Sequence, residues 1–122
     1  MKYFLLLTLL LSSCDYGTRI ILNDEHECTL TQVVTTYNPM VAETTTVMWT
    51  VYPFDHLIDT PDGQFSTHGV ETDAEIYWEI DDPKYIYSYV ELGVNRYLSA
   101  YLHEGSYTHP TRITQLYGRC SY

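Results

Sequence analysis

The feature that most constrains the fold is an alternation of apolar and polar residues with a period of two. In the segment 74–80, AEIYWEI, one set of alternate positions holds Ala74, Ile76, Trp78 and Ile80, and the other holds Glu75, Tyr77 and Glu79. Successive side chains of an extended strand point to opposite faces, so this pattern is typical of a strand with one buried face. The same alternation recurs over residues 44–52 and 84–92. The chain is therefore expected to fold as a β-sheet protein.

Short turn sequences separate these segments. Thr60-Pro61-Asp62-Gly63 combines a proline, which fixes φ, with an Asp-Gly pair that accommodates a positive φ. Similar turns follow Ile80, Leu92 and Leu102. Residues 74–80, 85–92 and 96–102 are predicted to form consecutive antiparallel hairpins, with further strands over 28–37 and 112–120 and a short edge strand over 18–22. The predicted fold is all-β, a small antiparallel sandwich or barrel of about six to eight short strands.

Two segments carry finer expectations. In residues 84–92, KYIYSYVEL, the alternation places Ile86, Ser88, Val90 and Leu92 toward the core and Tyr85, Tyr87, Tyr89 and Glu91 toward the outside. Residues 94–103, VNRYLSAYLH, also admit a helix, because their apolar residues suit a broad helical face. The short connection after Leu92 favours a hairpin, so a strand remains the prediction there.

The N-terminal residues predict export. One positive charge at Lys2 precedes an apolar block over residues 4–11, and two small serines follow. This order is that of a secretory signal peptide. The block is much shorter than the roughly 20 apolar residues of a membrane-spanning helix. Residues 1–13 are therefore expected to be removed.

The end of this segment, Leu11-Ser12-Ser13-Cys14, resembles the lipobox of bacterial lipoproteins. In that family the cysteine becomes the first mature residue and carries acyl chains, so the resemblance implies that Cys14 is the lipidation site. More than one acyl chain gives stable attachment, at about 0.8 kcal/mol per buried CH₂. The implied location is the cell envelope, on the periplasmic or surface side of a bacterial membrane. The alternative is an ordinary signal that is cut nearby, which would yield a secreted protein.

The three cysteines then have separate roles. If Cys14 is lipidated, Cys28 and Cys120 remain as one pair, and an oxidising compartment favours a disulfide between them. This bond would join the N-terminal and C-terminal strands of a single domain over residues 28–122, with residues 14–27 as a lipidated N-terminus and short acidic tether. No Cys-x-x-Cys spacing or basic cluster indicates a catalytic thiol.

The charge balance excludes some partners. Sixteen acidic and six basic residues give a formal net charge of −10. Nucleic-acid phosphates and anionic lipid heads repel such a surface, so nucleic-acid binding is excluded and membrane attachment is expected through the acyl chains alone.

The acidic run over residues 23–27 lacks the spacing and glycine of a calcium loop. The histidines are scattered beside turns and charges, where surface placement is expected. No metal and no cofactor are predicted.

Thirteen tyrosines are the most unusual feature of the composition. The strand assignment gives Tyr85, Tyr87 and Tyr89 a shared outward face and places Tyr77, Tyr97 and Tyr101 beside them on neighbouring strands. Each tyrosine offers rigid apolar area and a hydroxyl group at a low entropic cost, which suits a surface that binds an envelope protein or a glycan. The alternative is that cross-strand aromatic pairs only stabilise the sheet.

No catalytic motif is evident. Glu75 and Glu79 share a strand face, and His56 lies near Asp55 and Asp59, but no nucleophile in a glycine-flanked turn accompanies them. The chain is therefore expected to be a binding or interaction module rather than an enzyme. Two alternatives stay open, namely a secreted immunoglobulin-like viral or host-modulating effector, and a small hydrolase or sugar-active enzyme.

Overall fold

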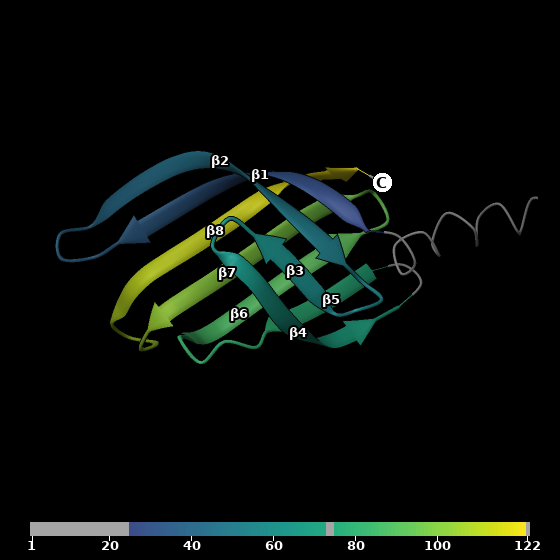
Figure 1. The fold of residues 1–122 in the computed structure, drawn as a ribbon. Coiled ribbons are helices and arrows are strands. Elements are labelled where there is room, and N and C mark those ends of the chain that lie inside the picture. The colour runs from purple at the N-terminus through teal and green to yellow at the C-terminus, as the bar shows by residue number, and fades with distance from the viewer. Residues whose placement is uncertain (1–24, 73–74, 122) are drawn as a thin grey trace, which may run out of the picture.

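The computed structural model describes residues 25–72 and 75–121, in which all regular structure is β-strand. The strands are β1 (His26–Thr36), β2 (Val41–Tyr52), β3 (Leu57–Thr60), β4 (Gly63–Glu71), β5 (Glu75–Ile80), β6 (Tyr85–Gly93), β7 (Tyr97–Gly105) and β8 (Pro110–Ser121). Each strand pairs antiparallel with the next, and β8 pairs with β1, which closes the sheet into a barrel (Figure 1). The all-β prediction is confirmed. The closed meander is one continuous sheet, unlike the two sheets of an immunoglobulin sandwich.

The alternation read from the sequence accounts for most of the barrel interior. On β5, Ile76, Trp78 and Ile80 are buried while the residues between them are exposed. The segment that also suited a helix is the strand β7, whose inward Leu98, Ala100 and Leu102 are buried. The expected signal segment, Cys14, the expected edge strand over 18–22 and Ala74 lie outside the described residues.

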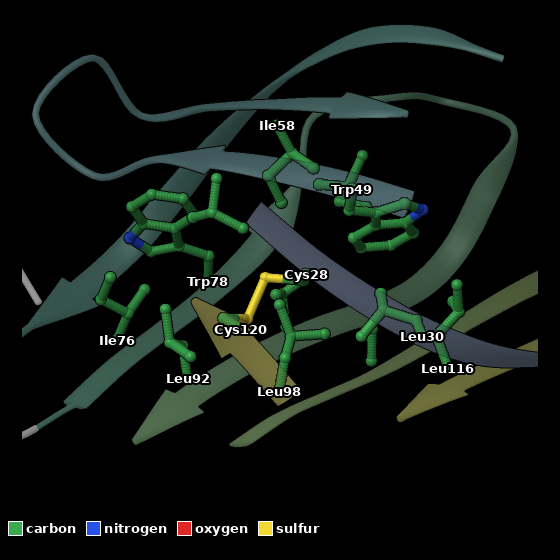
Figure 2. Close-up of a cluster of buried hydrophobic side chains, with 14 of the residues drawn as sticks. Cys28, Leu30, Trp49, Ile58, Ile76, Trp78, Leu92, Leu98, Leu116 and Cys120 are labelled. Atoms are coloured by element: carbon green, nitrogen blue, oxygen red, sulfur yellow. A yellow bond between two sulfur atoms is a disulfide. The ribbon is translucent and has the colours of Figure 1, made fainter. Parts of the chain in front are cut away.

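A disulfide between Cys28 and Cys120 joins β1 to β8, as predicted. The two cysteines are directly opposed in the β1–β8 ladder, and both side chains are buried in the core (Figure 2). The strand β1 begins at His26, two residues before the predicted start of the domain. The bond lies at one end of the barrel, and its two cysteines belong to the same buried cluster as Leu30, Leu98 and Leu116.

The inward positions become polar toward the other end of the barrel. On β1 the inward series runs from Cys28 and Leu30 to Gln32, and on β8 it runs from Leu116 to Thr114 and Arg112. On β7 the series ends at Glu104, which is paired in register with Arg112. One end of the barrel is therefore an apolar core, and the other carries polar and charged side chains among apolar ones such as Val34 and Val47.

This polar end is also the end where the barrel opens. The β1–β2 ladder extends over eleven residue pairs, but β2 pairs with β3 only from Thr50 to Tyr52. Within the described part of the chain, no strand pairs with the other edge of β2 between Val41 and Trp49. The β1–β2 hairpin accordingly extends beyond the neighbouring strands (Figure 1).

Candidate binding surface on the outside of the barrel

Four of the predicted tyrosines gather on the outside of β5, β6 and β7. The ring of Tyr89 lies between those of Tyr77 and Tyr101, with ring centroids 6.2 and 5.9 Å apart and nearly parallel planes. Tyr87 meets Tyr89 and Tyr101 edge-on at 6.2 and 5.9 Å. This arrangement follows from the register, because Tyr89 and Tyr101 are directly opposed in the β6–β7 ladder. Tyr77 and Tyr87 are 39% and 40% exposed.

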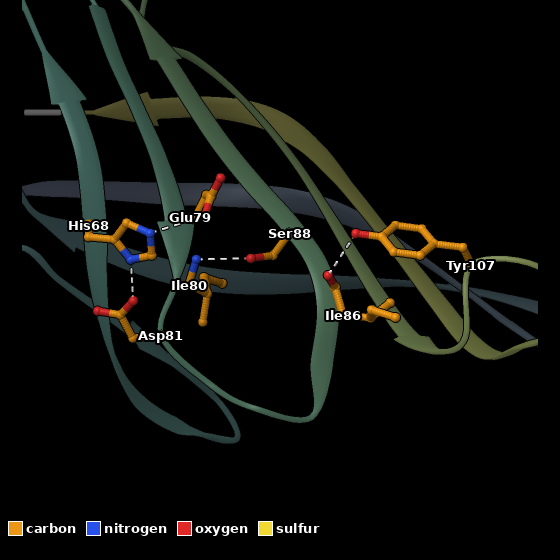
Figure 3. A network of polar contacts seen from close by, with 7 residues as sticks. All are labelled: His68, Glu79, Ile80, Asp81, Ile86, Ser88 and Tyr107. Carbon is orange, nitrogen blue, oxygen red and sulfur yellow. Dashed lines mark hydrogen bonds and ion pairs between the residues drawn. The ribbon is translucent and has the colours of Figure 1, made fainter.

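A fifth tyrosine comes from the loop between β7 and β8. The Tyr107 hydroxyl donates a hydrogen bond to the Ile86 carbonyl at 3.3 Å, so the loop lies against β6 (Figure 3). We call Tyr77, Tyr87, Tyr89, Tyr101 and Tyr107 the tyrosine face. Between β6 and the loop the face contains an open depression of about 530 Å³, which is lined by Tyr87, Tyr89, Tyr101, His103, Tyr107 and Gln115.

His103 holds the loop in place. Its Nε2 atom donates to the Ser106 carbonyl at 2.8 Å, and because a carbonyl only accepts, Nε2 carries the proton. In the neutral ring Nδ1 then accepts from the Tyr101 hydroxyl at 3.3 Å. The side chain of His103 is 7% exposed, and His26 is also buried, so the expected surface placement of the histidines is wrong at these two positions.

Two hydroxyl groups of the tyrosine face have a raised pKa and stay protonated at neutral pH. The pKa of Tyr77 is raised, mainly by its hydrogen bond with Tyr87 and next by burial. Burial is the main cause that raises the pKa of Tyr101. The hydroxyl of Tyr101 donates to His103 and that of Tyr107 donates to the Ile86 carbonyl, so these two hydroxyls can still accept a hydrogen bond from a partner.

Tyr85 does not belong to this face, and its predicted outward orientation is wrong. In the β6–β7 ladder Tyr85 pairs with Glu104 and Tyr87 pairs with His103, so Ile86 is an extra residue that forms a bulge. The bulge reverses the alternation. Tyr85 packs against the core, and Ile86, which was expected inside, is 41% exposed.

Tyr97 lies apart from the face at the start of β7. It points outward and is exposed, but it is four residues along the strand from Tyr101, or about 13 Å at the rise of a strand.

Sequence reasoning missed Tyr107, His103 and Gln115. Alternation along β8 would have found Gln115 and the exposed Tyr117, whereas nothing local marks Tyr107, because a loop has no fixed period.

Acidic residues border the tyrosine face on one side. Glu75 and Glu79 flank Tyr77 on β5, and Glu91 is directly opposite Tyr77 on β6; all three are exposed. Glu79 contacts Nε2 of His68 at 3.0 Å, and Asp81 contacts the other ring nitrogen (Figure 3). The hydrogen bond with Asp81 is the largest cause that raises the pKa of His68.

The acidic loop around His56 is arranged differently from the expected cluster. His56 contacts Glu71 at 2.9 Å and stacks on Trp78 at 5.4 Å. Glu71 also accepts from the Trp78 indole at 2.9 Å, and Asp59 accepts from the Tyr52 hydroxyl at 3.1 Å. The structure thus brings His56 to Glu71 rather than to Asp59.

In residues 25–72 and 75–121 no three histidine, cysteine or acidic side chains converge as they would around a metal ion. Over the same residues no helix has the length and apolar character to cross a membrane. No protein family matches this chain, and neither a curated protein nor a solved structure is significantly similar to it.

Proposed function

We propose that this chain is a lipid-anchored protein of a bacterial cell envelope whose barrel is a binding module for a partner protein. The observation that supports the binding role is the cluster of tyrosine rings across three adjacent strands, of which Tyr77 and Tyr87 are exposed. Tyrosine is enriched in protein interfaces, because one ring supplies rigid apolar area and its hydroxyl supplies a hydrogen bond. A sheet that needed only internal stability would not require Tyr77 and Tyr87 to remain so exposed.

The surroundings of the tyrosine face favour a protein partner over a glycan. The depression is open and broad, and the acidic margin of Glu75, Glu79 and Glu91 lies along one side of it. An apolar centre beside an acidic margin suits a partner surface with basic residues next to an apolar patch, because complementary charges steer association and select the partner. A neutral sugar chain could donate hydroxyl hydrogen bonds to these carboxylates but would gain no charge steering from them.

The proposed anchor is Cys14, on the lipobox resemblance. The first described residue, Glu25, follows Cys14 by eleven positions. At no more than about 3.4 Å per residue the barrel stands within a few tens of ångströms of the membrane. The partner is therefore itself a membrane protein or lies close to the membrane surface.

Intact mass tests the anchor. We expect the wild-type protein from a bacterial membrane fraction to begin at Cys14 and to carry acyl mass. We expect the Cys14→Ser variant to lack that mass and to leave the membrane fraction. A wild-type chain that begins beyond Cys14 and carries no acyl group would refute the anchor and favour the secreted alternative.

Site-specific photo-crosslinking in the envelope tests the binding role. A photoreactive phenylalanine analogue replaces Tyr87 in one variant and Thr46 in another, since Thr46 is exposed on the far side of the barrel on β2. We expect the Tyr87 position to capture one defined protein, the Thr46 position not to capture it, and Glu91→Lys to reduce the capture. Equal capture at both positions, or capture of carbohydrate alone, would refute a protein interface at the tyrosine face.

A further inference from the structure

A second cavity lies inside the barrel, at the polar end. It has a volume of about 150 Å³ and is lined in part by β2 and by the β3–β4 hairpin, near the place where β2 and β3 no longer pair. It shares no residue with the depression in the tyrosine face. The two sites are therefore independent, and a ligand of this cavity is a separate question from the partner of the face.

The floor of the cavity is apolar. Trp49, Ile80 and Leu102 line it from three different strands and are all buried, and the half-buried Phe65 extends this lining toward the opening. Such a floor favours the apolar part of a ligand, because water gains few hydrogen bonds there. A cavity of this volume is about the size that accommodates a benzene ring.

The rim of the cavity carries a positive charge that lies over aromatic rings. The Lys84 ammonium is 5.6 Å from the centroid of Phe65 and 5.0 Å from that of Tyr85. None of the ion pairs within the described ranges includes Lys84. Burial lowers the pKa of Lys84, but nearby Tyr85, Asp82 and Glu104 outweigh it and the net pKa is raised. The side chain is thus charged at neutral pH.

A second cation is on the other side of the rim. Arg112 lies across from Glu104, with 3.9 Å between Nε and the nearer carboxylate oxygen, so this glutamate is already partly neutralised. The described residues include only four lysines and arginines, and Lys84 and Arg112 are two of them. Half of the described basic side chains therefore line one small cavity, together with two carboxylates, Asp62 and Glu104; Glu104 faces Arg112, and Lys84 is the cation that lies over the aromatic rings.

We propose that this cavity binds a small carboxylate with an apolar body, with the carboxylate at Lys84 and the body against Trp49 and Leu102. The bulge at Ile86 is part of this site, because it turns Tyr85 inward beneath Lys84. A carboxylate at this place forms a charge-assisted hydrogen bond with the ammonium group. An organic cation with its charge at the same place is repelled by Lys84, so it would have to bind at Asp62 or Glu104 instead.

Three probes of equal size and different charge test the proposal, namely benzoate, benzamide and benzylamine. The reporter is the indole N–H signal of Trp49 in a two-dimensional NMR spectrum. Trp78 is the internal control, because its indole donates to Glu71 and it does not line the cavity. We expect benzoate to shift the Trp49 signal saturably with a Kd of about 1 mM. Benzamide should bind about tenfold more weakly, and benzylamine should cause no saturable shift.

Two matched variants identify the recognising group. Lys84→Gln removes the charge at an exposed position and should weaken the binding of benzoate about tenfold, to the affinity expected for benzamide. Arg119→Gln removes one charge on the outside of β8 away from the cavity and should leave benzoate binding unchanged. No shift of Trp49 up to about 20 mM benzoate would overturn the proposal. Equal affinities for benzoate and benzamide, or equal effects of the two variants, would also overturn it.

Discussion

Reduction of the Cys28–Cys120 disulfide should destabilise the barrel by several kcal/mol. The two cysteines are 92 positions apart in the sequence. In the chain-entropy description, a loop of this length removes unfolded-state entropy equivalent to about 4.6 kcal/mol at 25 °C. The native state itself changes little, because ten residue pairs of the β1–β8 ladder continue to hold the two strands together, so the loss comes from the larger entropy of the unfolded chain. We therefore expect a loss of about 3–5 kcal/mol, out of a total near 5–15 kcal/mol for a domain of this size.

The assay is urea unfolding of the protein of residues 14–122 with and without a reductant. The mass must rise by two hydrogens on reduction. The reduced protein should unfold at a lower urea concentration and with a steeper slope, because its unfolded chain is no longer cross-linked and exposes more surface.

Both sulfurs are buried, so reduction should be slow in native buffer and fast near the unfolding midpoint. A change of less than about 1 kcal/mol in the free energy of unfolding on reduction, with an unchanged slope, would refute a stabilisation through unfolded-state entropy. A cross-link that leaves the unfolded state as open as before cannot stabilise through chain entropy.

Three further outcomes are expected. Gly118→Ala should destabilise by about 1–3 kcal/mol in urea unfolding, because a Cβ atom there would lie 2.2 Å from the Thr29 carbonyl oxygen of the neighbouring strand; an unchanged midpoint would contradict this. An NMR titration should give His68 a pKa above 6.5. Because the pKa is raised in the folded state, the contribution of His68 to folding stability is complete below the unfolded pKa and is lost as pH rises through the folded pKa. Asp81→Asn should lower that pKa, and no change would refute the assigned cause. His103→Ala should speed amide hydrogen exchange over residues 105–109, while equal exchange would show that the Ser106 hydrogen bond does not hold the loop.

The strands were determined largely by the sequence itself. Alternation over residues 75–80 and 97–102 specifies an inward and an outward set without reference to any other part of the chain, since the period of two is a local property of an extended backbone. The disulfide followed from the cysteine count, with Cys14 assigned to the lipobox. The clustering of Tyr77, Tyr87, Tyr89 and Tyr101 also followed, because short connections set neighbouring strands side by side.

Tertiary structure alone decided the rest of each site. The bulge at Ile86 depends on how β6 meets β7, and this one extra residue moves Tyr85 from the outside to the rim of the inner cavity. Likewise, Tyr107 joins the tyrosine face only because its loop packs onto β6 and is bonded to His103. Closure between β1 and β8, and the early end of the β2–β3 pairing, are non-local as well. Local patterns set the direction of a side chain relative to its own strand, whereas its neighbours depend on contacts between residues that are distant in the sequence.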